Sequence, residues 1–446
     1  MRYEIAVIGG GIAGYVSALR LSRKGKKVAL VEKDEIGGVC LNYGCIPTKA
    51  LIFISDLFHR ISKARDYGIR VERVDYDNGA SLSWRNSVVK KLRKGVETLL
   101  ERSGVEVIKG EAKLLGAKKL SVSGGREIEA DKIIIATGSS PIEIKGLEFD
   151  GQQVLSSTDI LGGEQLPESI CIVGGGAIGV EIGQSLARLG VEVTIVEMMD
   201  QVLPGFSKDV VNFLVKELKS QGVRPVFGSR VVGAEKKGGK VELKISGKRE
   251  LSGAFEKVLI AVGRRPNSSG IGLERIGVSV DEKGFVSVDE EMRTNVPNVY
   301  AVGDVSGNPM LAHKALADAL IATDSILGVK RRKPEIPLVV YSRPEVAKVG
   351  LSEGEARSKG RDVLTGRFYF GASGRALTID EAVGVIKVVI DPSTREFLGM
   401  EICSPEASEL ISLGVLVVSL RLRADEVAEV VMPHPTLSEA FEEAVH

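Results

Sequence analysis

The stretch "IAVIGGGIAGYVSALRLSRKGKKVALVE", from Ile5 to Glu32, predicts the fold of the N-terminal part of this chain. An apolar run leads into Gly9, Gly11 and Gly14, and a helical pattern, a second apolar run and the acidic Glu32 follow. This order predicts a strand, a tight turn, a helix and a second strand, which together form a dinucleotide-binding βαβ unit. Because a lone glycine motif is common in ordinary turns, the flanking pattern carries the prediction.

A second copy of this pattern lies far along the chain. The stretch "ICIVGGGAIGVEIGQSLARLGVEVTIVE", residues 170–197, has its glycines at Gly174, Gly176 and Gly179 and ends on Glu197. All four positions follow their counterparts by the same 165 residues, as 174 − 9 and 197 − 32 show. In such units the glycines let the backbone approach a pyrophosphate at the helix N-terminus, and the acidic residue binds ribose hydroxyls. Two bound dinucleotides are therefore predicted, against the alternative of two merely structural turns.

The acidic residue of the second copy also indicates which pyridine nucleotide binds. Glu197 is followed by "MMDQVLPGFSK", which contains no arginine to hold a 2′-phosphate. A carboxylate at this position would repel that phosphate, so the sequence favours NAD over NADP. The alternative is a Glu197 side chain that points to solvent.

Two further segments support a flavin in the first site. "ADKIIIATGSSP" (130–141) is an apolar strand that ends at Thr137 and Gly138, and "NVPNVYAVGDVSG" (295–307) is another that ends at Gly303 and Asp304. An aspartate at the end of a strand can bind a ribityl hydroxyl or face a phosphate across backbone amides. Either segment alone could equally be a structural loop.

The stretch "GGVCLNYGCIPTKA" places Cys40 and Cys45 five residues apart, although the chain has only four cysteines in 446 residues. Zinc sites usually have four ligands at CxxC-like spacing. Cys171 and Cys403 lie in apolar segments typical of core cysteines, and none of the four histidines lies beside the pair. A metal site is therefore disfavoured.

A disulfide between Cys40 and Cys45 requires an interrupted helix. On an ideal helix, residues five apart have Cα atoms ~8.6 Å apart, whereas a disulfide needs less than about 7 Å. Gly44 loosens this segment and Pro47 cannot donate an interior helix hydrogen bond, so an interruption is encoded locally. Such a short loop gains little stability from a bridge. The pair is interpreted as a redox device.

With these residues in view, "GGVCLNYGCIPTKAL" resembles the redox-disulfide motif of the pyridine nucleotide–disulfide oxidoreductases. Within that family, "VEMMDQVLPGFSKDVV", "MLAHKA" and "HPTLSEAFEEA" are most similar to the branch that oxidises dihydrolipoamide, more than to glutathione or mercuric reductases. The similarity runs nearly end to end. An N-terminal metal-capturing domain and vicinal C-terminal cysteines are absent, which disfavours mercuric reductase.

The resemblance implies roles for four catalytic residues. Cys40 would exchange with the substrate and Cys45 would face the flavin. His434, held between prolines in "VMPHPTLSEAFEEA", would act as a base toward an attacking dithiol, with Glu439 orienting its ring. In relatives this histidine enters the partner subunit's site, so the resemblance implies a homodimer.

The resemblance also implies an ion pair between Lys49 and Glu181 beside the flavin N5, on the nicotinamide side. Two separate solvated charges are the alternative. Ala312, in "MLAHKA", and Gly263, in "AVGRRPN", are further expected cofactor contacts, and Lys49 is counted among these contacts as well.

The expected fold class is α/β, with two Rossmann-like dinucleotide-binding domains and a C-terminal α+β dimerisation domain. The FAD domain is expected at 1–142 and 268–335, split by an inserted NAD domain at 143–267, and the dimerisation domain at 336–446. A net charge of +1 gives no support for nucleic-acid or membrane binding. Scarce cysteines and the absence of a signal sequence predict a cytoplasmic location.

The implied function is oxidation of dihydrolipoyl groups through the disulfide to FAD and then to NAD⁺. The implied partner is dihydrolipoamide or the lipoyl domain of an acyltransferase subunit. The alternatives are a reductase for glutathione, another thiol or a quinone, and a mainly structural flavoprotein subunit. Val39 stands where threonine is common, and "VMP" precedes His434 where a second histidine is frequent.

Overall fold

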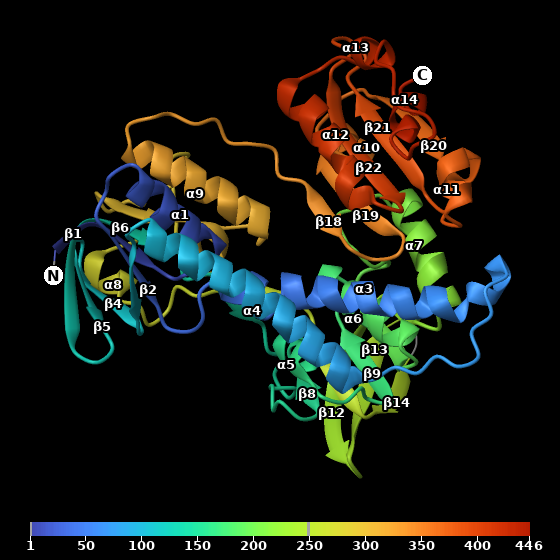
Figure 1. Cartoon of the computed structure of the whole chain (residues 1–446), viewed down its shortest axis with the longest axis horizontal. Helices are drawn as coiled ribbons and strands as arrows, with labels where there is room; N and C mark the ends of the chain where they lie inside the picture. Colours follow the sequence, from blue (N-terminus) through green and yellow to red (C-terminus); the bar gives the residue numbers. More distant parts are fainter. Residues whose placement is uncertain (1, 248–249) are drawn as a thin grey trace.

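The two glycine motifs each open a helix directly after a central parallel strand (Figure 1). The computed structural model describes residues 2–247 and 250–446. The first sheet consists of β1 (Arg2–Ile8), β2 (Val28–Glu32), β3 (Glu106–Lys109), β4 (Ala112–Gly116), β5 (Lys119–Val122), β6 (Arg126–Ile135) and β17 (Val299–Ala301). Its order is β3-β2-β1-β6-β5-β4, and β17 pairs with the second half of β6.

The second glycine motif belongs to a separate parallel sheet of order β11-β10-β9-β15-β8. Its strands are β8 (Val154–Leu155), β9 (Ser169–Val173), β10 (Glu192–Glu197), β11 (Arg224–Phe227) and β15 (Lys257–Ile260). An antiparallel sheet of β12 (Ser229–Lys237), β13 (Lys240–Gly247) and β14 (Leu251–Phe255) and a two-stranded ladder of β7 (Ser139–Pro141) and β16 (Arg264–Pro266) complete this part.

The C-terminal domain is built on an antiparallel sheet of order β18-β19-β22-β21-β20. Its strands are β18 (Leu338–Val340), β19 (Glu345–Gly350), β20 (Leu364–Tyr369), β21 (Val385–Ile390) and β22 (Phe397–Ser404). The expected fold class is confirmed: the chain has two Rossmann-like units and a C-terminal α+β domain.

The helices connect and cover these sheets. They are α1 (Ile12–Arg23), α2 (Gly38–Asn42), α3 (Cys45–Ser62), α4 (Asn78–Arg102), α5 (Ser157–Gly162), α6 (Ala177–Arg188), α7 (Lys208–Ser220), α8 (Leu273–Ile276), α9 (Ala312–Ile326), α10 (Glu353–Ser358), α11 (Gly374–Thr378), α12 (Ala407–Leu420), α13 (Ala424–Ala428) and α14 (Glu439–Glu443). The short 3₁₀ turns are Ala64–Tyr67, Gly303–Ser306 and Phe370–Ala372.

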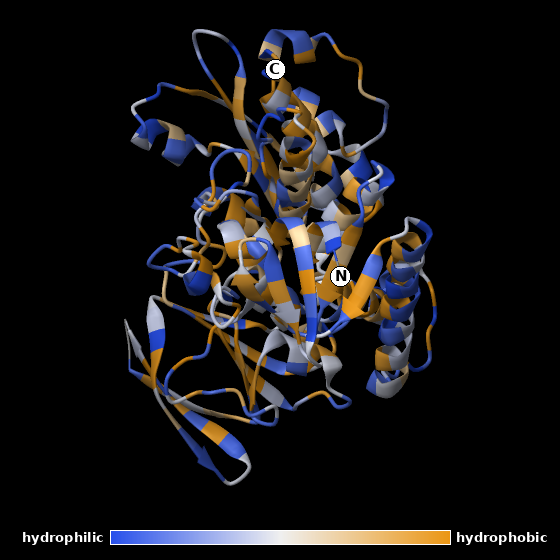
Figure 2. Ribbon diagram, turned by 90° about the vertical axis from the view of Figure 1, so that its left-hand side faces the viewer, coloured by the Kyte–Doolittle hydropathy of each residue, from blue (hydrophilic) through white to orange (hydrophobic). Residues whose placement is uncertain are grey.

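The central strands are apolar along their whole length because both faces of the parallel sheets are covered. All residues of β2 and β9 are buried. Helices pack on one face of β9, and the antiparallel sheet of β12, β13 and β14 packs on the other. The covering helices mix hydrophilic and hydrophobic residues, as Figure 2 shows. This packing fixes the turns that follow the strands, where the site is built.

The helix α3 is the longest apolar helical segment that reaches the site. Together with α2 it is the one stretch within 2–247 and 250–446 that has the length and hydropathy of a membrane span. In the fold α3 packs against α4 and α6, and Leu51 and Ile52 are buried. Figure 1 shows α3 beside α6 and below the C-terminal sheet. Packing within the chain therefore accounts for part of its apolar residues, whereas Phe53 and Leu57 are exposed.

The helix α12 departs from the burial that its composition suggests. Its apolar stretch "LISLGVLVVSL" (410–420) predicts a buried helix. Ile411 and Val417 are buried against the sheet, but Leu416 is 55% exposed and Leu420 is 64% exposed. One face of α12 packs on the C-terminal sheet and the other is left uncovered in the single chain.

Candidate active site

One cavity of about 390 Å³ follows the carboxyl ends of the strands of the first sheet and reaches the helix α6. Glu32 lies at one end, and Cys45, Lys49 and Glu181 lie at the other. The sequence-predicted residues that line it are Gly9, Gly11, Glu32, Cys40, Cys45, Lys49, Thr137, Gly138, Glu181, Gly303, Asp304 and Ala312. Parallel strands that end at one edge bring these distant segments together.

The glycines of the first motif divide into two kinds. A Cβ on Gly9 would overlap the carbonyl oxygen of Ala136, and one on Gly14 would overlap that of Gly9, so the chain's own packing requires both glycines. Gly9 also has φ +105°, a backbone conformation that favours glycine. A Cβ on Gly11 would meet only Gly38 Cα, at 3.9 Å, and would project into space that the chain itself leaves open.

The second motif repeats this division. Gly174 has φ +112°, and a Cβ on Gly174 or Gly179 would overlap backbone carbonyl oxygens. A Cβ on Gly176 would have no neighbour within 4 Å. In both copies the second glycine therefore keeps free space for a ligand, which fits a pyrophosphate at the N-termini of α1 and α6.

The two acidic residues are held in the same way. Glu32 accepts hydrogen bonds from the Gly10 amide and, at 2.7 Å, from the Asp34 amide. Glu197 accepts from the amides of Gly175 at 2.6 Å and Met199 at 2.7 Å. Both carboxylates are buried at the edge of their sites rather than turned to solvent. Each carboxylate keeps further acceptor capacity for ribose hydroxyls.

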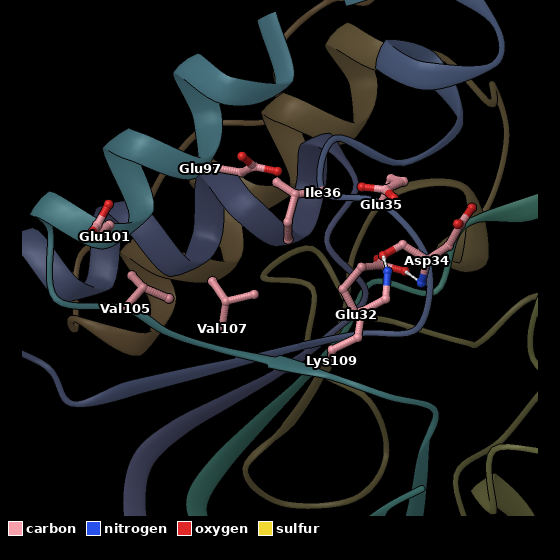
Figure 3. Close-up of a pocket in the computed structure, with 9 residues that line it drawn as sticks. All are labelled: Glu32, Asp34, Glu35, Ile36, Glu97, Glu101, Val105, Val107 and Lys109. Carbon is pink, nitrogen blue, oxygen red and sulfur yellow. Dashed lines mark hydrogen bonds between the residues drawn. The ribbon is translucent and has the colours of Figure 1, made fainter. Parts of the chain in front are cut away.

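A second cavity, of about 430 Å³, lies on the other side of Glu32 (Figure 3). Figure 3 shows Asp34 and Glu35 beyond the end of β2, with Glu97 and Glu101 on the facing helix α4. The carboxylates that line this cavity repel negative charge, so a phosphate group is disfavoured there. The pyrophosphate of a bound cofactor is therefore expected at the glycine turn, and a ribose at Glu32.

A chain of polar contacts that the sequence did not predict supports Asp304. The Ser139 hydroxyl donates to Asp304 Oδ2 at 2.5 Å, and Arg264 Nε donates to the same Ser139 hydroxyl oxygen at 2.7 Å. Arg264 and Asn267 also line the cavity. The signal available for both was the polar run "GRRPN", in which only Gly263 was selected. Gly263 itself has φ +126° and lies outside the cavity lining.

The helix is interrupted between the two cysteines, as the spacing requires. α2 ends at Asn42, Tyr43 and Gly44 form the break, and α3 begins at Cys45. Thr48, also missed, closes the first turn of α3 with a hydroxyl bond to Gly44 O at 2.7 Å. The structure contains both cysteines as thiols, and both line the cavity.

The two thiols are not equivalent. The hydrogen bond from Cys40 and the positive charge of Lys49 lower the pKa of Cys45 to about 7, although burial and Glu181 oppose this shift. The same hydrogen bond and burial raise the pKa of Cys40. Within the reduced pair Cys45 is therefore the thiolate and Cys40 the donor. Cys171 and Cys403 are buried elsewhere, and burial raises the pKa of each thiol.

Lys49 and Glu181 form an ion pair, although they lie 132 residues apart in the chain. Lys49 Nζ lies 2.8 Å from Glu181 Oε2, and the two side chains are 33% and 6% exposed. This geometry rules out the alternative of two separate solvated charges. The buried carboxylate holds the ammonium group at the end of the cavity, next to Cys45.

His434 and Glu439 form their own pair at the C-terminal end. His434 Nδ1 lies 2.6 Å from Glu439 Oε1, and Glu439 Oε2 accepts from the Thr436 amide at 2.7 Å. These bonds lower the pKa of the Glu439 carboxyl. The His434 side chain is 81% exposed, and neither residue lines the cavity of its own chain. The pair is oriented, but the single chain does not bring it to the cysteines.

No cluster within 2–247 and 250–446 gathers three or more His, Cys, Asp or Glu side chains in a way that could hold a metal ion. The polar groups around the cysteines are the Lys49 ammonium group, the Glu181 carboxylate and the hydrogen-bonded side chains of Ser139, Asp304 and Arg264. The free space beside Gly11 and the acceptor at Glu32 fit a dinucleotide such as FAD.

We expect Gly11→Ala and Gly176→Ala to separate the two sites. Because neither Cβ would clash with the protein, the free energy of unfolding of each variant should lie within about 1 kcal/mol of the wild-type value. Gly11→Ala should purify with less flavin, whereas Gly176→Ala should keep flavin and bind NAD⁺ at least about tenfold more weakly. Flavin content and NADH titration measure the two effects. A Gly176→Ala chain that loses flavin would contradict the assignment.

The chain was compared with known proteins. Residues 3–319 match the family described as pyridine nucleotide-disulphide oxidoreductase, and residues 336–445 match its dimerisation domain. Dihydrolipoyl dehydrogenase of Thermus scotoductus is 42% identical over 99% of this chain and 96% of its own length. The enzyme of the same name from Geobacillus stearothermophilus is 39% identical, over 99% and 95%.

Two solved structures share the whole fold. LpdA from Mycobacterium tuberculosis has a TM-score of 0.93 and 27% identity, and the match covers 100% of this chain and 99% of that one. The HOCl-induced flavoprotein disulfide reductase RclA from Escherichia coli has a TM-score of 0.89 and 29% identity, covering 99% of both chains.

Proposed function

The chain belongs to the pyridine nucleotide-disulphide oxidoreductases, and from this premise we propose that it oxidises dihydrolipoyl groups with NAD⁺ as the final acceptor. It is a flavoprotein disulfide oxidoreductase whose cofactors are FAD and NAD. The family and the enzyme class expected from the sequence are confirmed. One observation carries the finer proposal: the Cys45 thiolate lies beside Lys49 in the same cavity as the first glycine turn.

In the proposed reaction a dihydrolipoyl thiolate attacks Cys40 Sγ of the oxidised pair. The Cys40–Cys45 bond breaks, a mixed disulfide forms at Cys40, and Cys45 leaves as a thiolate stabilised by Lys49. The second lipoyl sulfur then attacks its neighbour in the mixed disulfide, which releases lipoyl disulfide and the Cys40 thiol. His434 takes up one of the two substrate protons, and the other ends on the sulfur of Cys40. A flavin bound in the cavity supplies the two-electron transfer from the cysteine pair to NAD⁺.

The proposed enzyme is a homodimer. The match to the dimerisation domain supports this, and so do the uncovered Leu416 and Leu420 on α12. The exposed His434 would then enter the partner's cavity. The proposed protein partner is the lipoyl domain of an acyltransferase subunit, with dihydrolipoamide as its small-molecule equivalent.

The domain boundaries remain part of the proposal. We assign FAD binding to 1–142 and 268–335, NAD binding to 143–267, and dimerisation to 336–446. We further propose a cytoplasmic location, because a chain with only four cysteines in 446 residues is typical of a reducing compartment.

The proposed function is tested by NADH formation from dihydrolipoamide and NAD⁺ with the purified FAD-loaded protein. We expect turnover that depends on both substrates. Turnover with glutathione or another thiol, and none with dihydrolipoamide, would mean that this other thiol is the substrate. No turnover with any thiol despite full flavin content would favour a structural subunit.

We expect the enzyme to prefer NAD⁺ over NADP⁺ by about 10- to 100-fold in kcat/KM, because Glu197 would face the extra phosphate. The buried Glu197 carboxylate already accepts hydrogen bonds from two backbone amides and cannot turn away without breaking these bonds. Steady-state kinetics with both nucleotides measure the ratio. Equal kcat/KM values would mean that Glu197 does not contact the ribose.

A further inference from the structure

The segment from Tyr341 to Arg343 of the C-terminal domain lies against α6. The Tyr341 amide donates to Glu181 Oε1 at 2.9 Å. The Arg343 amide donates to Gln184 Oε1 at 2.7 Å, and Gln184 Nε2 donates back to Arg343 O at 2.6 Å. Three backbone contacts therefore fix this segment on the face of α6 that carries Glu181.

The fixed backbone places the Tyr341 ring on Lys49. Lys49 Nζ lies 4.3 Å from the ring centroid, well within the range of a cation–π contact. Glu181, which already holds the Tyr341 amide through Oε1, holds the same ammonium group through Oε2 at 2.8 Å. The Tyr341 hydroxyl forms no hydrogen bond with a described residue, so the ring is the part that acts.

We propose that Tyr341 is a positioning residue of this active site: its ring, delivered by the C-terminal domain, holds the Lys49 ammonium group against Glu181 and beside Cys45. The proposal rests on the proposed function and adds to it a residue that the sequence did not single out. Tyr341 does not itself line the cavity, and it reaches the site through its contacts with Lys49 and Glu181.

The consequence is electrostatic. The charged or titrating groups that act on Cys45 are Cys40, Lys49, Glu181 and Arg264. Lys49 is the one among them on the same helix, one turn away, and its long side chain is 33% exposed. Without the ring, this side chain gains rotamers that carry its charge away from the thiolate. The Cys45 thiolate then loses part of its stabilisation.

The test compares Tyr341→Leu, which removes the ring, with Tyr341→Phe, which keeps it. Tyr369→Leu is the matched control, because Tyr369 belongs to the same domain and faces Phe213 instead of a lysine. Each variant is made in the FAD-loaded Cys40→Ser protein, so that one thiolate titrates at the flavin. The readouts are the pH midpoint of the long-wavelength thiolate–flavin band and the reduction potential of the bound flavin.

We expect Tyr341→Leu to raise the pH midpoint by roughly half a unit or more. Tyr341→Phe and Tyr369→Leu should keep the wild-type midpoint. In the Cys40-containing enzyme, Tyr341→Leu should lower kcat several-fold and leave KM for NAD⁺ unchanged. The reduction potential of the bound flavin should shift together with the pH midpoint in Tyr341→Leu, and it should stay unchanged in Tyr341→Phe and Tyr369→Leu.

Two results would overturn the proposal. One is a Tyr341→Leu variant whose pH midpoint equals that of the Cys40→Ser protein with Tyr341 intact. The other is a Tyr341→Phe midpoint that moves as far as that of Tyr341→Leu, because the ring would then not be the active part. In a Lys49→Met background Tyr341→Leu should add no further shift, which separates an effect through Lys49 from a general loosening. These spectra do not depend on the thiol substrate, so the proposed function can fail while this proposal holds.

Discussion

We expect His434→Ala to lower dihydrolipoamide oxidation by about 10²–10⁴-fold, the usual effect of losing a positioned acid–base group. The fold, flavin content and dimer should persist, because the ring is 81% exposed and contributes little packing within its chain. Glu439→Gln should cost less, since the amide oxygen that remains can accept from His434 Nδ1 or from the Thr436 amide, though not from both. Steady-state kinetics and thermal unfolding measure the two effects.

The same residue should act across the dimer. With Nδ1 held by Glu439, the opposite ring nitrogen, Nε2, is the one available to a neighbouring subunit. Mixing Cys45→Ser chains with His434→Ala chains in equal amounts should restore about one quarter of the wild-type sites. Each mixed dimer then has one site with both cysteines and an intact histidine from the other chain. If verified subunit exchange restores no activity, His434 acts in its own chain or not at all.

We expect Cys40→Ser and Cys45→Ser each to lower dihydrolipoamide oxidation by at least about 10³-fold, because each removes a sulfur of the exchanging pair. Their spectra should differ. Cys40→Ser keeps the Cys45 thiolate beside the flavin site and should show a long-wavelength charge-transfer band. Cys45→Ser should show none, because burial still raises the pKa of the Cys40 thiol in this variant.

The band of Cys40→Ser should depend on pH with a defined sign. The hydrogen bond from residue 40 and the charge of Lys49 lower the pKa of Cys45, to about 7 in the wild type. The thiolate, and with it the band, should be present above the midpoint and disappear as the pH falls below it. An absorbance titration measures this midpoint. A band in Cys45→Ser and none in Cys40→Ser would reverse the assignment of the two thiols.

The interrupted helix between Cys40 and Cys45 shows how far local reasoning reaches. The spacing, Gly44 and Pro47 predict a break, and α2 does end at Asn42. Which thiol carries the charge follows instead from the hydrogen bond between the two thiols and from the charge of Lys49, and neither composition nor spacing reports these contacts. The exposed face of α12 is a similar case, because its uniform apolar sequence hides which side meets the sheet.

Two of the residues that sequence reasoning missed share one property. Arg264 and Tyr341 act through contacts with segments far away in the chain: Arg264 binds Ser139, 125 residues earlier, and the Tyr341 amide binds Glu181, 160 residues earlier. A pairing of this kind leaves no periodic or local pattern in either segment. The pairing of β7 with β16 reveals the first contact, and the packing of the C-terminal domain on α6 reveals the second.

The sequence by itself determined the two βαβ units, their glycine turns and their acidic residues, because strand, turn and helix preferences act over a few residues and repeat after 165 positions. It also indicated that the two cysteines could form a disulfide only if the helix between them is interrupted. The tertiary structure alone decided that Lys49 meets Glu181, that Tyr341 covers this ion pair, and that His434 faces outward from its own chain. These outcomes depend on how separate sheets and helices pack, and packing joins residues whose distance along the chain carries no information about their distance in space.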